Sequence, residues 1–183
     1  MENFATIDAA SLHAIGAIVD EWNHCEMEMF ILVERLSRMD AHKLKILIGD
    51  ANNVEIAEKA KSLCKFINAP PDVQAVIVNY CAVFDVCRIN RNSIVHAWPE
   101  GKGFRTQKGH SLEKHLFAAP LNVLREVADE ITLCRARLVK LNDALRRVPR
   151  CALPDTLPVP KTRWLPPQPA QTKQPHRQKS SQP

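Results

Sequence analysis

Apolar residues recur between residues 15 and 39 in alternating steps of three and four, and this spacing constrains the fold more than any other feature. The positions that follow it are Ile15, Ile18, Trp22, Cys25, Met29, Leu32, Leu36 and Met39. Such spacing gives a helix one apolar stripe, which is stable when other helices cover it. Asp8 or Ser11 is suited to cap the start of this helix. The sequence therefore predicts a first helix that packs within a bundle.

Two further helices are predicted in the next 60 residues. One runs over about residues 53–67, and its expected inward positions are Val54, Ala57, Ala60, Leu63, Cys64 and Ile67. The other begins at Pro71 or Asp72, because proline suits the first turn of a helix and an acid suits its positive end. It continues to about His96, where Trp98-Pro99 stops it, since the residue before a proline disfavours helical backbone angles.

The last helix is predicted to start near Pro120 and to close at Pro149. Its apolar stripe is Leu124, Val127, Ile131, Cys134, Leu138, Leu141 and Leu145. The glycine-bearing stretch 98–118 has no helical period and is predicted to be a long loop, with a short hairpin around 104–108. Four main helices and one long loop predict an all-α helical bundle over residues 1–148.

The composition changes at Pro149, because nine of the chain's 13 prolines lie between there and Pro183. Such a segment buries too little apolar surface to offset its ordering entropy. Residues 149–183 are therefore expected to form a disordered, partly polyproline-II tail, a solubilising extension in which Trp164 is the one large anchor. The tail from Arg150 on holds six basic residues and one acid, which accounts for the net charge of +5. The preceding 149 residues sum to zero, so an attraction for RNA has to come from a local patch.

Composition also bounds the class of protein. The six cysteines include no C-x-x-C pair, which argues against zinc, and no carboxylate or histidine group shows the spacing of metal ligands. No segment reaches the roughly 18 apolar residues that a membrane span needs. We therefore expect a reduced, cytoplasmic protein with no membrane association and no cofactor.

Polar residues interrupt the end of the third predicted helix. Arg91, Asn92 and His96 lie in a stretch whose approach is otherwise apolar, and Asp85 and Arg88 lie one to two turns earlier. At roughly 100° per residue, Asp85, Arg88, Asn92 and His96 share about one quadrant of the helix, whereas Arg91 is about 140° from His96. Buried polar groups need partners, so this cluster is the candidate site.

These side chains suit one reaction. A histidine exchanges a proton near neutral pH, and an arginine presents a planar cation that fits a phosphate. A base beside a ribose 2′-hydroxyl and a cation on the neighbouring phosphate are the minimum for RNA cleavage by internal transesterification without a metal. Arg91, His96 and Asn92 are therefore the candidate catalytic residues. Arg88 and Asp85 are assigned supporting, substrate-binding roles.

The segment Arg91-Asn92-Ser93-Ile94-Val95-His96 resembles the R-x(4–6)-H motif of the HEPN superfamily (higher eukaryotes and prokaryotes nucleotide-binding domains). A polar residue follows the Arg, a Trp follows the His by two residues, and the motif ends a long helix in a small helical bundle, as in that family. The resemblance implies an endoribonuclease that acts as a homodimer through the motif helices. In it His96 would be the general base on the 2′-hydroxyl and Arg91 would bind the scissile phosphate, leaving a 2′,3′-cyclic phosphate. The partner's His96 would protonate the leaving 5′-oxygen. Bacterial defence, stress response or a toxin–antitoxin pair, with a cognate antitoxin protein, is the setting it implies.

Two alternatives remain open at the level of the sequence. The neutral body fits a non-catalytic HEPN-like module that binds RNA, a nucleotide or a protein. A helical scaffold is the other, in which Asp85 and Arg88 simply pair and His96 caps the last turn of its helix.

Overall fold

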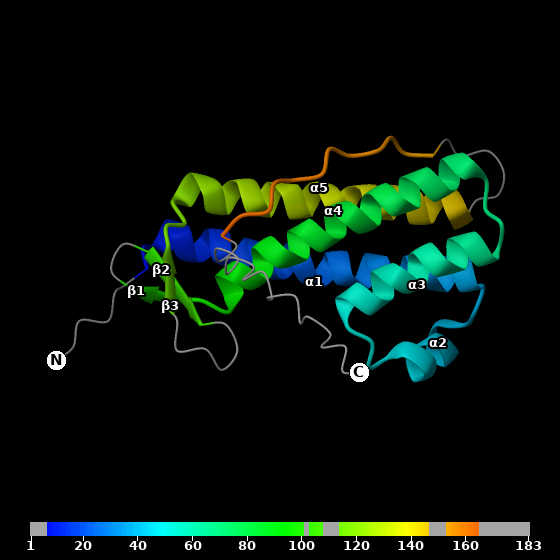
Figure 1. Ribbon diagram of the computed structural model, residues 1–183, viewed down its shortest axis with the longest axis horizontal. Helices are drawn as coiled ribbons and strands as arrows, with labels where there is room; N and C mark the ends of the chain where they lie inside the picture. Colours follow the sequence, from blue (N-terminus) through cyan, green and yellow to red (C-terminus); the bar gives the residue numbers. More distant parts are fainter. Residues whose placement is uncertain (1–6, 101–102, 108–113, 147–152, 165–183) are drawn as a thin grey trace, which may run out of the picture.

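The computed structural model describes residues 7–100, 103–107, 114–146 and 153–164. Over these residues the chain is a bundle of five α-helices with a small antiparallel sheet at one end (Figure 1). The elements are α1 (Ala9–Ser37), α2 (Ala41–Ile48), α3 (Asn53–Phe66), α4 (Pro71–Val95), β1 (Trp98–Glu100), β2 (Gly103–Gln107), β3 (Lys114–Phe117) and α5 (Leu121–Arg146). The predicted helical bundle is confirmed.

The first helix ends earlier than its apolar pattern suggests. Asp8 caps α1 by accepting a hydrogen bond from the backbone N–H of Ser11 at 2.9 Å. Arg38 then adopts a left-handed conformation with φ of 54°, which ends the helix, and Asp40 caps a separate short helix, α2. The sequence predicted no such helix, because arginine rarely takes this conformation and no glycine or proline marks the break.

The second and third predicted helices correspond to α3 and α4. An Asn52–Glu55 capping box starts α3, and Pro71 occupies the first turn of α4. Two expected inward positions of α3 are wrong, since Val54 and Ile67 are both 44% exposed while Ile56 is buried in their place. The inward face of α3 is therefore rotated slightly from the one that the sequence indicates.

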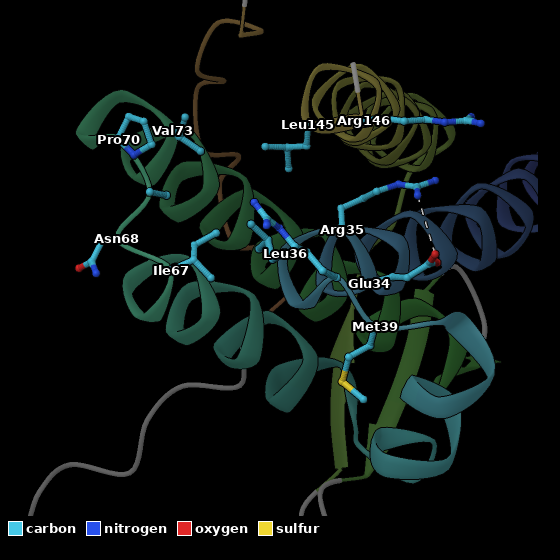
Figure 2. Close-up of a pocket in the computed structure, with 12 residues that line it drawn as sticks. Glu34, Arg35, Leu36, Met39, Ile67, Asn68, Pro70, Val73, Leu145 and Arg146 are labelled. Atoms are coloured by element: carbon cyan, nitrogen blue, oxygen red, sulfur yellow. Dashed lines mark ion pairs between the residues drawn. The ribbon is translucent and has the colours of Figure 1, made fainter. Parts of the chain in front are cut away.

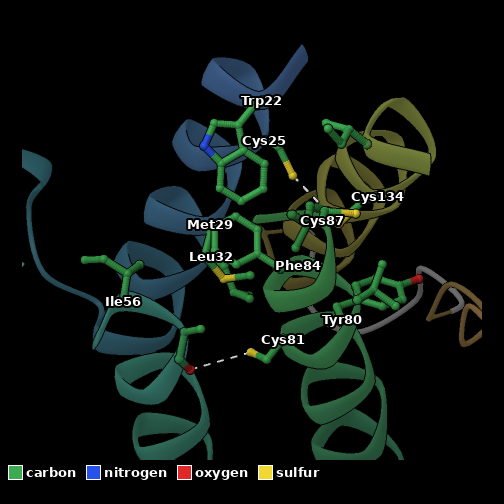
Figure 3. Close-up of a cluster of buried hydrophobic side chains, with 14 of the residues drawn as sticks. Trp22, Cys25, Met29, Leu32, Ile56, Tyr80, Cys81, Phe84, Cys87 and Cys134 are labelled. Carbon is green, nitrogen blue, oxygen red and sulfur yellow. Dashed lines mark hydrogen bonds between the residues drawn. The ribbon is translucent and has the colours of Figure 1, made fainter. Parts of the chain in front are cut away.

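The core lies where α1, α4 and α5 meet. Trp22 stacks on Phe84 with ring centroids 4.7 Å apart, and the Sγ atoms of Cys25 and Cys134 are 3.7 Å apart across α1 and α5 (Figure 3). The five described cysteines are free and buried, as expected of small apolar residues. The predicted apolar stripe of α5 is buried from Leu124 to Leu141. Burial of this stripe and of the apolar stripe of α1 holds the long helices together.

The predicted long loop contains a three-stranded sheet. Its order is β1-β2-β3, and both pairings are antiparallel. Arg105 pairs with Trp98 on one side and with Leu116 on the other, so β2 is the central strand. The expected hairpin over 104–108 coincides mostly with β2, and residues 101–102 and 108–113 on either side of β2 lie outside the described residues. This sheet connects the end of α4 to the start of α5.

Residues 153–164, which we call the strap, follow a defined extended path across α4 and α5 (Figure 1). The Asn79 amide donates to the Leu157 carbonyl at 2.9 Å and accepts from the Leu157 N–H at 2.8 Å. The Asn90 amide donates to the Lys161 carbonyl at 3.0 Å and accepts from the Arg163 N–H at 2.7 Å. The expectation of a disordered tail is therefore corrected for these residues, whereas residues 165–183 lie outside the described part.

The strap follows α4 because the spacing of Asn79 and Asn90 along the helix matches the spacing of the backbone groups that they bind. Asn79 and Asn90 are three helical turns apart, which is about 16 Å along the helix axis. On the strap, Asn79 binds Leu157, and Asn90 binds Lys161 and Arg163, so the two attachment points are on average about five residues apart. Five residues of polyproline-II chain span about 15.5 Å. Pro154, Pro158 and Pro160 favour this extended form. Two asparagines on one edge of a helix thus bind the backbone of a proline-rich segment.

Candidate functional site

The candidate site lies on the last two turns of α4, but its residues start from different faces of the helix. Arg91 follows Cys87 by four residues and Phe84 by seven, and both of these are buried. Residues at these spacings share a face, so the stem of Arg91 begins on the side of α4 that faces the core. Asn92 and His96 lie on the opposite, outward side, and His96 is exposed. Arg91 and His96 therefore do not share a face within one chain.

Asn92 connects the two faces. The Nη1 of Arg91 donates a hydrogen bond to the Oδ1 of Asn92 at 3.0 Å. The Nε of Arg91 is buried and has no hydrogen-bond partner in the described part of the chain. Arg91 thus extends from the core face with a buried stem and directs its guanidinium to the outward side, as long cationic side chains commonly do. The Asn92 amide holds that cation beside the face on which His96 lies.

His96 is the residue at which the helix ends. Its backbone N–H donates to the carbonyls of Asn92 and Ile94, and its φ of −94° is no longer helical. The exposed ring has room to contact a bound molecule, which a buried histidine would not have.

Arg88 and Asp85 form an ion pair within the helix. The Nη2 of Arg88 lies 2.6 Å from Oδ1 of Asp85, and its Nε donates to the same oxygen at 3.0 Å. The Asp85 side chain is 47% exposed, so the pair contributes at most about 1 kcal/mol to stability. This pairing is the one expected if the chain is a helical scaffold, in which Asp85 and Arg88 simply pair. It also leaves Arg88 with less capacity to bind a substrate phosphate than the sequence suggested.

The sequence singled out residues 91–96 and overlooked the neighbouring Asn90. Asn90 is fully buried, and its amide binds the strap. The sequence does contain a signal for this contact. Asn90 is an uncharged polar residue on the same helical face as Val76 and Val83, and Asn79 precedes it by eleven residues. Polar groups on that face need partners, and the partner here is the strap.

A separate hollow of about 640 Å³ lies at the opposite end of α4 (Figure 2). Arg35, Arg38 and Arg146 line it, together with apolar residues at the turn between α3 and α4. Arg35 and Arg146 are in the last turns of α1 and α5, where cations balance the negative ends of helix dipoles. Their charge is therefore explained without a ligand. The hollow is roughly 35 Å from His96, because its lining residue Val73 precedes His96 by 23 residues along α4.

Comparisons with known proteins do not assign the chain. It matches no protein-family model, no curated protein and no solved structure. Among the described residues no group of three or more His, Cys, Asp or Glu side chains is placed to hold a metal ion. In the same residues, no helix is both long enough and apolar enough to cross a membrane. The interpretation of the site therefore depends on its own geometry.

Proposed function

We propose that the chain is a metal-independent endoribonuclease of HEPN type that acts as a homodimer. One observation carries the proposal: the Arg91 guanidinium, bound to Asn92 at 3.0 Å, is directed to the side of α4 on which His96 is exposed. A phosphate-binding cation and a proton-exchanging group are thus held near the end of one helix. This combination is what cleavage by 2′-hydroxyl attack requires.

A second copy of the chain completes the proposed site. The outward face of α4 carries Asn92 and His96 together with Ala82, Ile89 and Val78, of which Val78 is 49% exposed. Such a mixed face is suited to pair with its own copy, and paired α4 helices would bring two His96 side chains to one cleft. In this shared cleft His96 of one chain takes the proton of the 2′-hydroxyl, and Arg91 stabilises the charge on the phosphate. The partner's His96 gives a proton to the leaving 5′-oxygen.

The test is cleavage of a mixed RNA pool by the purified chain in EDTA. His96→Ala should lower the rate by about 100-fold or more, the usual contribution of a general base. Arg91→Lys keeps a charge but loses the fork that binds Asn92, so it should also lower the rate strongly. His42→Ala, at an exposed position on α2, is the matched control and should cleave normally. The products should end in 2′,3′-cyclic phosphates.

Two results would contradict the mechanism. Cleavage that survives both substitutions would place the chemistry elsewhere, and cleavage that EDTA abolishes would require a metal. Circular dichroism shows whether each variant still folds, and sedimentation velocity shows whether it still dimerises. Together they distinguish loss of the site from loss of the fold or of the dimer. Val78→Glu should separate the dimer and reduce cleavage, because it places two like charges across the proposed interface.

A helical scaffold is the second candidate, and the intrachain pairing favours it. Arg88 is bound to Asp85 and Arg91 to Asn92, so both cations already have partners within one chain. Such a scaffold would neither cleave nor bind RNA. A folded chain that shows no RNA binding and yields no cyclic-phosphate ends would support this alternative, whereas RNA binding without cleavage would support the non-catalytic binding module.

A further inference from the structure

Positive charge is concentrated in the later part of the chain. Residues 1–84 contain 7 basic and 12 acidic residues, whereas residues 85–183 contain 18 basic and 8 acidic ones. The neutral sum of the first 149 residues therefore combines an acidic beginning with a basic continuation. The basic part includes the candidate site and the strap, and a local excess of this kind attracts a polyanion such as RNA.

The strap fixes the backbone of Lys161 beside the end of α4. The fully buried amide of Asn90 donates to the Lys161 carbonyl at 3.0 Å and accepts from the Arg163 N–H at 2.7 Å. Lys161 itself is exposed, and its side chain makes no ion pair with any residue that the structure describes. Its ammonium group is therefore available to an anion, while its backbone position is set by the helix.

The strap also neutralises acidic side chains of α5. The Nη1 of Arg163 lies 2.8 Å from Oε2 of Glu126, and its Nη2 lies 2.7 Å from Oε1 of Glu130. The two glutamates carry a charge of −2 without the strap, and Arg163 with its neighbouring lysine brings this to zero. Arg125 and Asp129, the other charged residues in these turns of α5, cancel each other. The strap thus removes a repulsion that RNA would otherwise meet here.

Lys161 lies near the candidate site. Asn90, which holds its backbone, precedes Arg91 by one residue and His96 by six. Six residues are about 9 Å along the helix axis, and they place Asn90 about 120° around the helix from His96. The strap therefore borders the outward face of α4 on which His96 is exposed. A phosphate next to one bound at His96 would lie toward this border.

We propose that the strap forms part of an RNA-binding surface in which Lys161 binds a backbone phosphate next to the scissile one. The inference rests on the proposed function, because it places the same RNA strand at Arg91 and His96. Lys161 binds the substrate and takes no part in the proton transfers. A lysine serves this purpose as a point charge on a flexible stem, while the strap supplies its fixed position.

Binding of an RNA that cannot be cleaved tests the proposal on the full chain. The probe is a fluorescein-labelled 2′-O-methyl oligouridine, which has no 2′-hydroxyl to attack, and its anisotropy is followed over a series of salt concentrations. One phosphate contact on a single strand contributes about 0.7 to the slope of log affinity against log salt. Lys161→Gln should lower the slope by that amount and the affinity by about fivefold near 0.1 M salt. Lys161→Arg keeps the charge and should restore both.

Two further variants separate the position of the charge from its presence. Lys43→Gln removes one charge from an exposed position on α2, at the other end of the bundle from β1 (Figure 1), and should bind as the wild type does. Asn90→Ala leaves every charge in place but loosens the strap, so it should weaken binding as well. Circular dichroism checks that each variant is folded.

Four results would overturn the proposal. They are wild-type binding by Lys161→Gln, equal weakening by Lys43→Gln, wild-type binding by Asn90→Ala, and a Lys161-dependent affinity for vesicles of anionic lipid above that for the RNA. The last would assign the surface to a membrane.

Failure of the proposed ribonuclease gives a different result. Ordinary RNA would then stay intact while Lys161→Gln still weakened binding of the 2′-O-methyl probe, which supports the RNA-binding surface without the cleavage. Where ordinary RNA is cleaved, Lys161→Gln should raise KM and leave kcat unchanged, as loss of uniform substrate binding does. A lower kcat with an unchanged KM would contradict the role given to Lys161.

Discussion

Replacing Asn90 by alanine should release the strap from α4. The change removes two hydrogen bonds, from the amide to the Lys161 carbonyl at 3.0 Å and from the Arg163 N–H at 2.7 Å. At about 1 kcal/mol for each bond, the loss is about 2 kcal/mol. Alanine favours the helix over asparagine by about 0.5 kcal/mol, so the net cost should be about 1.5 kcal/mol of unfolding free energy.

Asn79→Ala is a matched control on the same helix and the same strap. It also removes two hydrogen bonds, both with the backbone of Leu157. Asn79 is only partly buried, whereas Asn90 is 0% exposed. Water can therefore replace the lost bonds at Asn79, and the helix propensity of alanine offsets most of the remainder. The free energy of unfolding should change by less than about 0.5 kcal/mol.

Urea denaturation followed by circular dichroism measures both changes, and the m value should stay constant if the fold is retained. Hydrogen exchange then localises the effect. In Asn90→Ala the Arg163 amide should exchange faster, while the Leu157 amide stays protected by Asn79. Equal destabilisation by the two variants would show that burial does not set the strength of these contacts. An unchanged Arg163 amide in Asn90→Ala would show that Asn90 does not hold the strap.

Three further predictions concern the bundle. Phe84→Ala should lower the free energy of unfolding by about 3–5 kcal/mol in urea titrations, because it leaves Trp22 beside a cavity. Hydrogen bonds from the Ser11 side chain and backbone lower the pKa of Asp8, so its contribution is present above the unfolded pKa and is lost as pH falls through the folded value. Asp8→Asn should therefore flatten the acid side of a stability-against-pH curve. Burial raises the pKa of Cys81 to about 12, so iodoacetamide should label it only after unfolding, as peptide mass spectrometry would show.

The long helices were predictable because their signals are local. The three-and-four spacing of α1 and α5, the cap at Asp8 and the proline at the start of α4 act over one or two turns. The break at Arg38 was not predictable, because no glycine, asparagine or proline in the sequence marks the left-handed backbone there. The sheet was missed for a similar reason, since strands of three to five residues have too few positions to show a period of two.

The candidate site was predictable in its residues but not in its arrangement. Helical spacing correctly put Asn92 and His96 on one side and Arg91 on another, and it paired Asp85 with Arg88. Spacing does not reveal that the Arg91 guanidinium contacts Asn92, because that depends on the direction of a long side chain. The strap could not be read from composition alone, since a proline-rich segment looks disordered until a partner for its backbone is known.

The surfaces of α4 limit how a second chain could complete the site. One side of the helix faces the core through Phe84 and Cys87, and one edge is covered by the strap through Asn79 and Asn90. The side that remains uncovered in the described structure is the one that carries His96. A homodimer through α4 would therefore use this face, which carries both Val78 and His96. The strap thus removes one edge of α4 from the surfaces that the proposed dimer could use.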